Sequence, residues 1–302
     1  MAGELITTDG QMEWRGLLLG ERSPYAGRIL TGWDDLPPLD DGTVLRAQQH
    51  GAVPGRLLAR ARVLSWDAEL IPEDPAADAL WPQYLAALRA ATGIQQDEQP
   101  LVVQLGGQRL QVMARVTART IPADQQYTWG YPKISLEWTC SDPLRYDTAA
   151  QSVQTGLPTA ETGLVWGSPE TGLAWGSPAE TGLVWGSPGS TGDVLCTNAG
   201  DTSTGVAIEI HGPCVTPSIT VYGTTTVLEY ALTLTAADVL YIDTQAGTVL
   251  LGGQDRQGTA TARSVPEESV RIPPGDTVLS FRSADPATTA ASATVRWRSA
   301  YW

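Results

Sequence analysis

The sequence predicts a mainly β protein with one helix, organised as two folded domains joined by a repetitive linker. Three observations support this fold class. The chain has 302 residues with 42% hydrophobic content, a length that usually corresponds to two domains. Apolar and polar residues alternate with a period of two in both halves. A segment rich in Gly, Ser and Pro separates the halves, so we expect domains at 1–150 and 195–302 with a linker at 151–194.

The N-terminal half contains one helix candidate. It begins near Asp74 and Pro75 and ends at Gly93, with Pro82 complicating its first turn. Its apolar side is formed by Leu80, Tyr84, Leu85 and Leu88. The rest of this half is expected to supply the sheet on which the helix packs.

Strand signals surround this helix. The stretch "LVVQLGGQRLQVMARVTARTI" indicates a hairpin that turns at Gly106 and Gly107. "KISLEWTC" places Ile134, Leu136 and Trp138 on one face, and "RLLARARVLSW" predicts an earlier strand. The N-terminal domain is therefore predicted to be a β-sandwich or split barrel carrying one helix.

Beyond residue 194 the chain consists of short strand signals with turns between them. They include "GVAIEIHG", "SITVYG", "TVLEYALTL", "VLYIDT", "TVLLGG", "SVRIPPGDTVLSFRS" and "ATVRWRSAYW". Helical periodicity is absent from this region. Such spacing favours an antiparallel β-sandwich or jelly roll.

The central segment "ETGLVWGSPETGLAWGSPAETGLVWGSPGSTGD" repeats one phrase three times and places Trp166, Trp175 and Trp185 nine and ten residues apart. This period is too short for a stacked repeat fold. Each unit reads as one short strand and a turn, which cannot bury an indole by itself. The interpretations are a linker docked on a neighbouring domain or subunit, an aromatic platform that stacks on glycan, and a structurally idle duplication.

The charge balance makes this chain a poor candidate for a protein that binds DNA or RNA tightly. The net charge is −14 and no segment is basic, so phosphate neutralisation is unavailable, although the chain could surround DNA without holding it. There is no run of about 18 apolar residues and no signal-peptide pattern at the N-terminus. We expect no membrane partner and folding in a cytoplasm.

The residues that usually carry catalysis do not form a recognisable site. His50 and His211 lie near no G-x-S-x-G signature, and we interpret both as turn histidines. Three cysteines, Cys140, Cys196 and Cys214, show no disulfide framework and are read as buried thiols.

Metal, carboxylate and phosphate sites are also not predicted. His211, Cys214 and Cys196 contain only one close pair of ligands, which is too few for a zinc site. The acidic stretch "WDDLPPLDDG" departs from calcium-loop spacing and is interpreted as a solvated loop. No phosphate-cradling motif occurs. The sequence therefore predicts no catalytic residue, no cofactor and no metal.

Several phrases together resemble one protein family. In the first half these are "QQHGAVPGRLLARARVLSWDAEL" and "YTWGYPKISLEWTCSDPLRY", which ends in a "DPLRY" pattern. In the second half they are "LCTNAGDTSTGVAIEIHGPCVTPSITV", "YIDTQAGTVLL", "IPPGDTVLSF" and "ATVRWRSAYW". In order and spacing they resemble the distal tail proteins of long-tailed bacteriophages with flexible, non-contractile (siphovirus-type) tails, over nearly the whole chain.

The resemblance implies a structural virion protein of the tail tip. Its N-terminal domains would form a homo-hexameric ring that joins the tail tube protein to the tip and receptor-binding proteins, with a galectin-like C-terminal sandwich outside. DNA would pass through the ring without specific binding, as an acidic channel allows. The repeat is longer than the connection expected for the family. The alternative from another class is a carbohydrate-binding adhesion module that recognises host cell-surface glycans.

Overall fold

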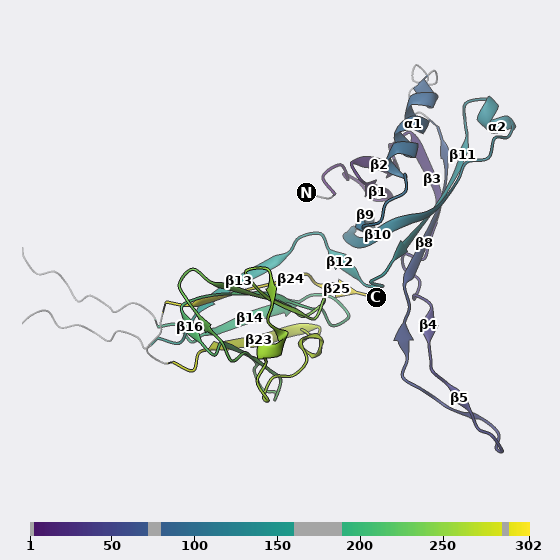
Figure 1. The fold of residues 1–302 in the computed structure, drawn as a ribbon. Coiled ribbons are helices and arrows are strands. Elements are labelled where there is room, and N and C mark those ends of the chain that lie inside the picture. Colours follow the sequence, from purple (N-terminus) through teal and green to yellow (C-terminus); the bar gives the residue numbers. More distant parts are fainter. Residues whose placement is uncertain (1–2, 72–79, 160–188, 286–289) are drawn as a thin grey trace, which may run out of the picture. The chain divides into compact units, whose positions relative to one another are not determined.

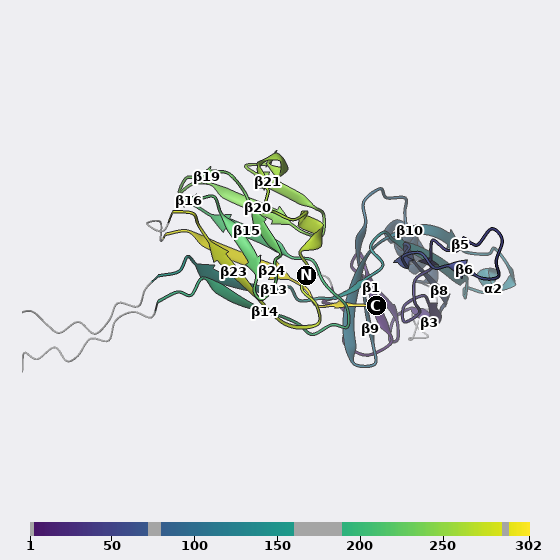
Figure 2. The ribbon, with the colours of Figure 1, turned by 90° about the horizontal axis from the view of Figure 1, so that it is seen from below.

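The computed structural model describes residues 3–71, 80–159, 189–285 and 290–302 (Figures 1 and 2). The chain divides into two compact units. The first comprises Met1–Ala149 together with Ala300–Trp302, and the second comprises Ala150–Ser299.

The first unit is built on one curved antiparallel sheet. Its strand order is β2 (Leu17–Gly20), β1 (Gln11–Trp14), β9 (Gln99–Leu105), β10 (Gln108–Thr120), β11 (Lys133–Cys140), β8 (Arg62–Leu70) and β3 (Tyr25–Thr31). Off this path, β12 (Arg145–Asp147) pairs with β10 and with β25 (Ala300–Tyr301). The chain's last strand thus belongs to its first unit.

The predicted hairpin at Gly106 and Gly107 is confirmed. Leu105 pairs with Gln108, and the two glycines have φ values of 59° and 78°, as a two-residue turn with positive φ at both positions requires. The 13-residue strand β10 pairs with β9 through Ala114 and with β11 from Arg115 onward. A bulge between Val116 and Ala118 bends the strand, so β10 carries the sheet around the core.

The helix α1 (Trp81–Ala91) covers this core. Pro82 lies in its first turn, where no intrahelical N–H is needed. Of the predicted apolar side, Leu85 and Leu88 are buried, whereas Leu80, just before the helix, is exposed. The indole Nε1 of Trp14 donates to the carbonyl oxygen of Ala91 at 2.9 Å. These contacts fix the helix on the sheet, whereas the expected start near residues 74 and 75 lies outside the described residues.

The core of the first unit is rich in aromatic rings. Ile134, Leu136 and Trp138 on β11 are all buried, which confirms the alternation predicted for this strand. The Trp138 ring lies 6.0 Å from the ring of Trp14 and 6.4 Å from that of Trp66. A second short helix, α2 (Gln125–Thr128), is capped by Asp124, whose carboxylate accepts a hydrogen bond from the Tyr127 N–H.

The second unit is an antiparallel β-sandwich, as predicted. One sheet has the order β13 (Gln151–Gly156), β24 (Ser292–Trp297), β15 (Ala207–His211), β20 (Val239–Asp243), β21 (Thr248–Leu251) and β22 (Gln254–Asp255). The other has the order β14 (Asp193–Asn198), β23 (Gly275–Arg282), β17 (Ser218–Val221) and β18 (Val227–Glu229). Smaller elements are β16 (Cys214–Val215), paired with β19 (Thr233–Leu234), and the 3-10 turns η2 (Gln257–Thr259) and η3 (Glu267–Ser269).

The core of this sandwich forms from the inward residues of the two sheets. Ile208 and Ile242 face it from one sheet, and Ile219 and Phe281 from the other, all with at most 2% exposure. Alternation of side chains along each strand, visible in the sequence, therefore specifies this packing.

The observed units differ from the expected domain boundaries in two places. Residues 151–156, expected to start the linker, form β13 and pair with β24 from Gln151↔Trp297 to Gly156↔Ser292. Residues 300–302, expected in the second domain, belong to the first unit. A polar edge strand such as "QSVQTG" gives no alternation signal, which is why the sequence did not separate it from the linker.

The tryptophan repeat lies within the second unit's stretch of chain. Residues 160–188, including Trp166, Trp175 and Trp185, are outside the described residues. On either side of them, the Thr159 N–H donates to the Ser190 carbonyl oxygen at 2.9 Å, and the Ser190 N–H donates to Thr159 Oγ1 at 2.9 Å. Residues 159 and 190, which flank the repeat, are thus bonded to each other within the second unit, whereas the repeat was expected to connect the two domains.

Candidate functional site

The most conspicuous feature of the first unit is a long two-stranded ribbon, residues 36–60, which we call the arm. It consists of β4 (Leu39–Asp40) paired with β7 (Leu58–Ala59), followed by β5 (Val44–Leu45) paired with β6 (Ala52–Val53). In Figure 1 the arm extends well beyond the start of β8, away from the core of its own unit. It has no neighbouring strand from the described residues on either edge.

The arm exposes an unusual amount of apolar surface. Seven of its large apolar side chains are between 43% and 81% exposed. They are Leu36, Leu39, Val44, Leu45, Val53, Leu57 and Leu58. An isolated two-stranded ribbon is only marginally stable in water, and a gathering of exposed apolar side chains on one segment indicates a protein contact surface. The arm therefore has the properties of a segment that another protein surface covers.

Two glycines let the strands of the arm approach closely. A Cβ atom at Gly55 would lie 2.5 Å from the Gly42 carbonyl oxygen and 2.6 Å from that of Asp41, both main-chain atoms that cannot move aside. At the tip, Arg46 N–H donates to the Gly51 carbonyl oxygen at 3.3 Å, and His50 is exposed in this turn. The ribbon geometry is thus set by local sequence.

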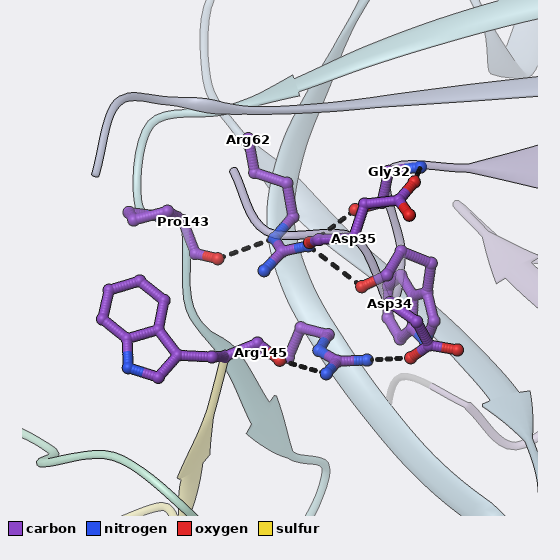
Figure 3. A network of polar contacts seen from close by, with 8 residues as sticks. Gly32, Asp34, Asp35, Arg62, Pro143 and Arg145 are labelled. Carbon is purple, nitrogen blue, oxygen red and sulfur yellow. Dashed lines mark hydrogen bonds and ion pairs between the residues drawn. The ribbon is translucent and has the colours of Figure 1, made fainter. Parts of the chain in front are cut away.

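The base of the arm is held by the buried guanidinium of Arg62, the first residue of β8 (Figure 3). Its Nη1 donates to the carbonyl oxygens of Gly32, Trp33 and Asp35 at 2.6, 2.9 and 2.8 Å. Its Nε donates to the Pro143 carbonyl oxygen at 2.7 Å. One side chain therefore joins the loop before the arm, the strand after it and a distant turn.

Arg62 is only 1% exposed, so the hydrogen bonds of its Nε and Nη1 take the place of water, whereas its buried Nη2 has no partner among the described residues. Burial lowers the pKa of its guanidinium, and the charge of nearby Arg145 lowers it further. The group still remains charged at neutral pH, since arginine starts from a very high pKa. Four main-chain carbonyl oxygens depend on this one cation.

A second arginine extends this anchor (Figure 3). Arg145 pairs with Asp34 at 2.5 Å and donates to the main-chain oxygen of Trp302. Its guanidinium lies 5.6 Å from the ring centroid of Trp33, which is buried. Because the Asp34 side chain is 78% exposed, this ion pair adds little stability by itself. Its main effect is to orient the loop that leads into the arm.

The "DPLRY" phrase forms the turn that supports both arginines. Asp142 accepts hydrogen bonds from the Leu144 N–H at 3.0 Å and from the Tyr146 hydroxyl at 2.6 Å. The acidic stretch 33–42 was expected to be a solvated loop; its four aspartates are exposed, as expected, but its first residue is not. Trp33 is buried and its carbonyl oxygen is bonded to Arg62, because the arm must be fixed where it leaves the sheet.

The cysteines and histidines considered from the sequence differ in exposure. The three cysteines are buried free thiols, as predicted, and burial raises the pKa of Cys140 and of Cys196 to about 12. His211 is exposed at the end of β15. Within the described ranges, no group of three or more His, Cys, Asp or Glu residues could hold a metal, and no helix there is long and apolar enough to cross a membrane.

Comparison with known proteins identifies the fold. Neither a protein-family model nor a curated protein matches the sequence. Among solved structures, the chain is similar to the Dit protein of phage SPP1, with 15% identity, a TM-score of 0.60, and coverage of 97% of this chain and 99% of that one. That protein is described as a paradigm of the hub adsorption apparatus in phages that infect Gram-positive bacteria.

Two structures of the phage P2 baseplate in its activated conformation, with calcium and with strontium, match at 10% identity. Each has a TM-score of 0.44 and coverage of 91% of both chains. The similarity to SPP1 Dit shows a shared fold across nearly the whole chain. It confirms the fold expected from the resemblance to distal tail proteins.

Sequence reasoning missed the arm and its anchor. The tip "RAQQHG" between two short apolar pairs, together with Gly42 and Gly55, is a signal that could have indicated a hairpin. No local signal could reveal Arg62, since its acceptors at positions 32–35 and 143 come together only in the folded unit.

Proposed function

We propose that this protein is a non-enzymatic structural component of a phage tail tip that assembles into a homo-hexameric ring through its arm. The observation that carries the proposal is an apolar arm, rigidly anchored at its base, on the fold shared with a phage hub protein. The arm provides the contact surface, and the fold supplies the context in which such contacts form rings.

A ring requires a head-to-tail contact in which one surface of each subunit meets a different surface of the next. An arm that reaches away from its own core is suited to this role, because it contacts a neighbour without being blocked by its own unit. Covering its seven apolar side chains would contribute on the order of 10 kcal/mol per contact. The Arg62 anchor holds the arm at one angle, and a constant angle is what makes a ring close.

In this role the ring joins the tail tube protein to the tip and receptor-binding proteins, at the tail tip of the virion. The protein would fold in the host cytoplasm before assembly. The net charge of −14 suits a channel through which DNA passes without specific binding. No cofactor or metal enters the proposal, since assembly needs complementary surfaces and no reacting group.

The test is the assembly state of the purified full chain, measured by light scattering after size exclusion and by negative-stain electron microscopy. We expect particles with six-fold symmetry and a central hole. The double substitution Val44→Asp with Leu45→Asp should convert them to monomers. Ile94→Asp is the matched control, because Ile94 is 97% exposed and lies outside the arm.

Two results would contradict the proposal in distinguishable ways. A wild-type chain that stays monomeric at micromolar concentration would count against the ring itself. Rings that persist in the Val44→Asp and Leu45→Asp variant would retain the ring but remove the arm from its interface.

A further inference from the structure

The second unit contains a cavity of about 570 Å³ that the proposed ring does not use. It lies where the turn between β17 and β18, the segment before β23 and the loop around residue 203 come together. Ligand sites in proteins occupy roughly 300–1,000 Å³, so the cavity is large enough for a small molecule or the end of a polymer. We call it the Tyr222 cavity, and the lining residues that matter are Ser203, Tyr222, Thr226, Ser269, Arg271 and Asp276.

Tyr222 presents an aromatic ring at this cavity and is 73% exposed. The main chain that carries it is nevertheless fixed. Its N–H donates to the Val278 carbonyl oxygen on β23 at 2.9 Å, and Thr224 closes the turn by donating to the Val221 carbonyl oxygen from its N–H and its Oγ1. An exposed aromatic ring on a rigid turn can stack on a ligand with little loss of the protein's conformational entropy.

The charged groups at the cavity are oriented by neutral partners. Arg271 Nη1 donates to Gln245 Oε1 at 3.0 Å, and Asp276 Oδ1 accepts from Thr197 Oγ1 at 2.6 Å. Neither group is neutralised by an ion pair with another described residue. Arginine can only donate and an ionised aspartate can only accept, so the cavity offers both kinds of hydrogen-bonding group.

Hydroxyl groups complete the lining. Ser203, Thr226 and Ser269 each contribute one, and the hydrogen bonds found among the described residues do not engage these three hydroxyls. A hydroxyl both donates and accepts, which suits a ligand whose own edge carries hydroxyls.

The loops that carry these residues are tied to the sandwich. Thr204 and Ile272 exchange two main-chain hydrogen bonds of 2.9 Å, which fixes the neighbours Ser203 and Arg271. The buried Asn198 side chain donates to the Ile272 carbonyl oxygen at 3.1 Å. The cavity is therefore preformed.

We propose that the Tyr222 cavity binds a saccharide. A sugar ring has an apolar C–H face, which stacks on an aromatic side chain, and an edge of hydroxyls, which pair with donor and acceptor groups together. A phosphate group would be repelled by Asp276, and an apolar peptide would leave the charges and hydroxyls unpaired. This role is separate from ring assembly and does not depend on it.

The test uses the full-length protein on an array of bacterial cell-surface saccharides that contain hexoses, N-acetylhexosamines and deoxyhexoses. The saccharide that binds most strongly is then titrated by calorimetry. We expect Tyr222→Ala to weaken binding about tenfold or more and Tyr222→Phe to keep most of it, because the ring face is retained. Asp276→Asn should also weaken binding.

Two controls separate a loss of binding from a loss of structure. Tyr222 is exposed, so the melting temperature and the assembly state of Tyr222→Ala should match the wild type. Trp129→Ala removes another aromatic ring, 64% exposed in the first unit, and should bind as the wild type does.

The proposal is overturned if the wild type binds no saccharide on the array. It is equally overturned if Tyr222→Ala binds as tightly as the wild type. Binding that disappears only when Trp166, Trp175 and Trp185 are all replaced by Ala would assign saccharide recognition to the repeat and refute a site at Tyr222.

Discussion

Arg62 and Pro143 lie 81 residues apart in the chain, and the Nε of Arg62 donates a 2.7 Å hydrogen bond to the Pro143 carbonyl oxygen. Three further main-chain oxygens before the arm accept from the same guanidinium. The same hydrogen bonds therefore stabilise the first unit and set the direction in which the arm leaves it. The proposed assembly therefore depends on a residue that lies at the base of the arm and is buried from solvent.

Replacing Arg62 by Met should destabilise the first unit by about 3 kcal/mol or more, because four main-chain carbonyl oxygens lose their donor. Urea unfolding measures the change. Arg60→Met is the matched control, since Arg60 makes only an exposed ion pair with Asp40 and should cost less than about 1 kcal/mol. Equal stability of the two variants would show that Arg62 is not an anchor.

Replacing Gly55 by Ala should distort the arm while leaving the core of its unit folded. The added Cβ meets main-chain oxygens of Gly42 and Asp41 at 2.5 and 2.6 Å, so the strands must separate. We expect assembly to weaken by at least about tenfold in sedimentation velocity, with a nearly unchanged melting temperature. Gly258→Ala, which meets no atom within 4 Å, should assemble normally.

The buried thiol of Cys140 should make stability fall at alkaline pH. Burial raises its folded-state pKa to about 12 from an ordinary value of 9.0. The unfolded chain therefore loses this proton first, so the stabilisation is complete below pH 9 and declines as the pH rises toward 12. Between pH 8.5 and 10.5 the wild type should lose about 2 kcal/mol more unfolding free energy than Cys140→Ala. The same loss in both proteins would exclude the thiol as the cause.

Trp166, Trp175 and Trp185 remain a prediction, because they lie outside the described residues. If the repeat docks on a neighbouring surface, these indoles should be shielded from water. Incorporation of 5-fluorotryptophan, with resonances assigned by Trp→Phe substitution at each position, tests this through the solvent isotope shift. Large shifts at all three positions would contradict docking and favour the glycan platform.

The sequence by itself determined the elements whose causes are local. The turn at Gly106 and Gly107 follows from the positive φ that only glycine adopts easily, and the buried face of β11 follows from strict alternation in "KISLEWTC". Pro82 in the first turn of α1 and the antiparallel sandwich of the second unit also follow from local sequence patterns.

Only the tertiary structure decided the features that depend on distant partners. The arm could not be predicted from the sequence, because its apolar residues look like core residues and only the fold shows that they are exposed. Strand β25 returns to the first unit, and the Tyr222 cavity gathers residues from 203 to 276. Hydrogen bonds such as that from Arg62 to Pro143 join positions whose distance in space is set by the whole sheet, and no local pattern encodes that distance.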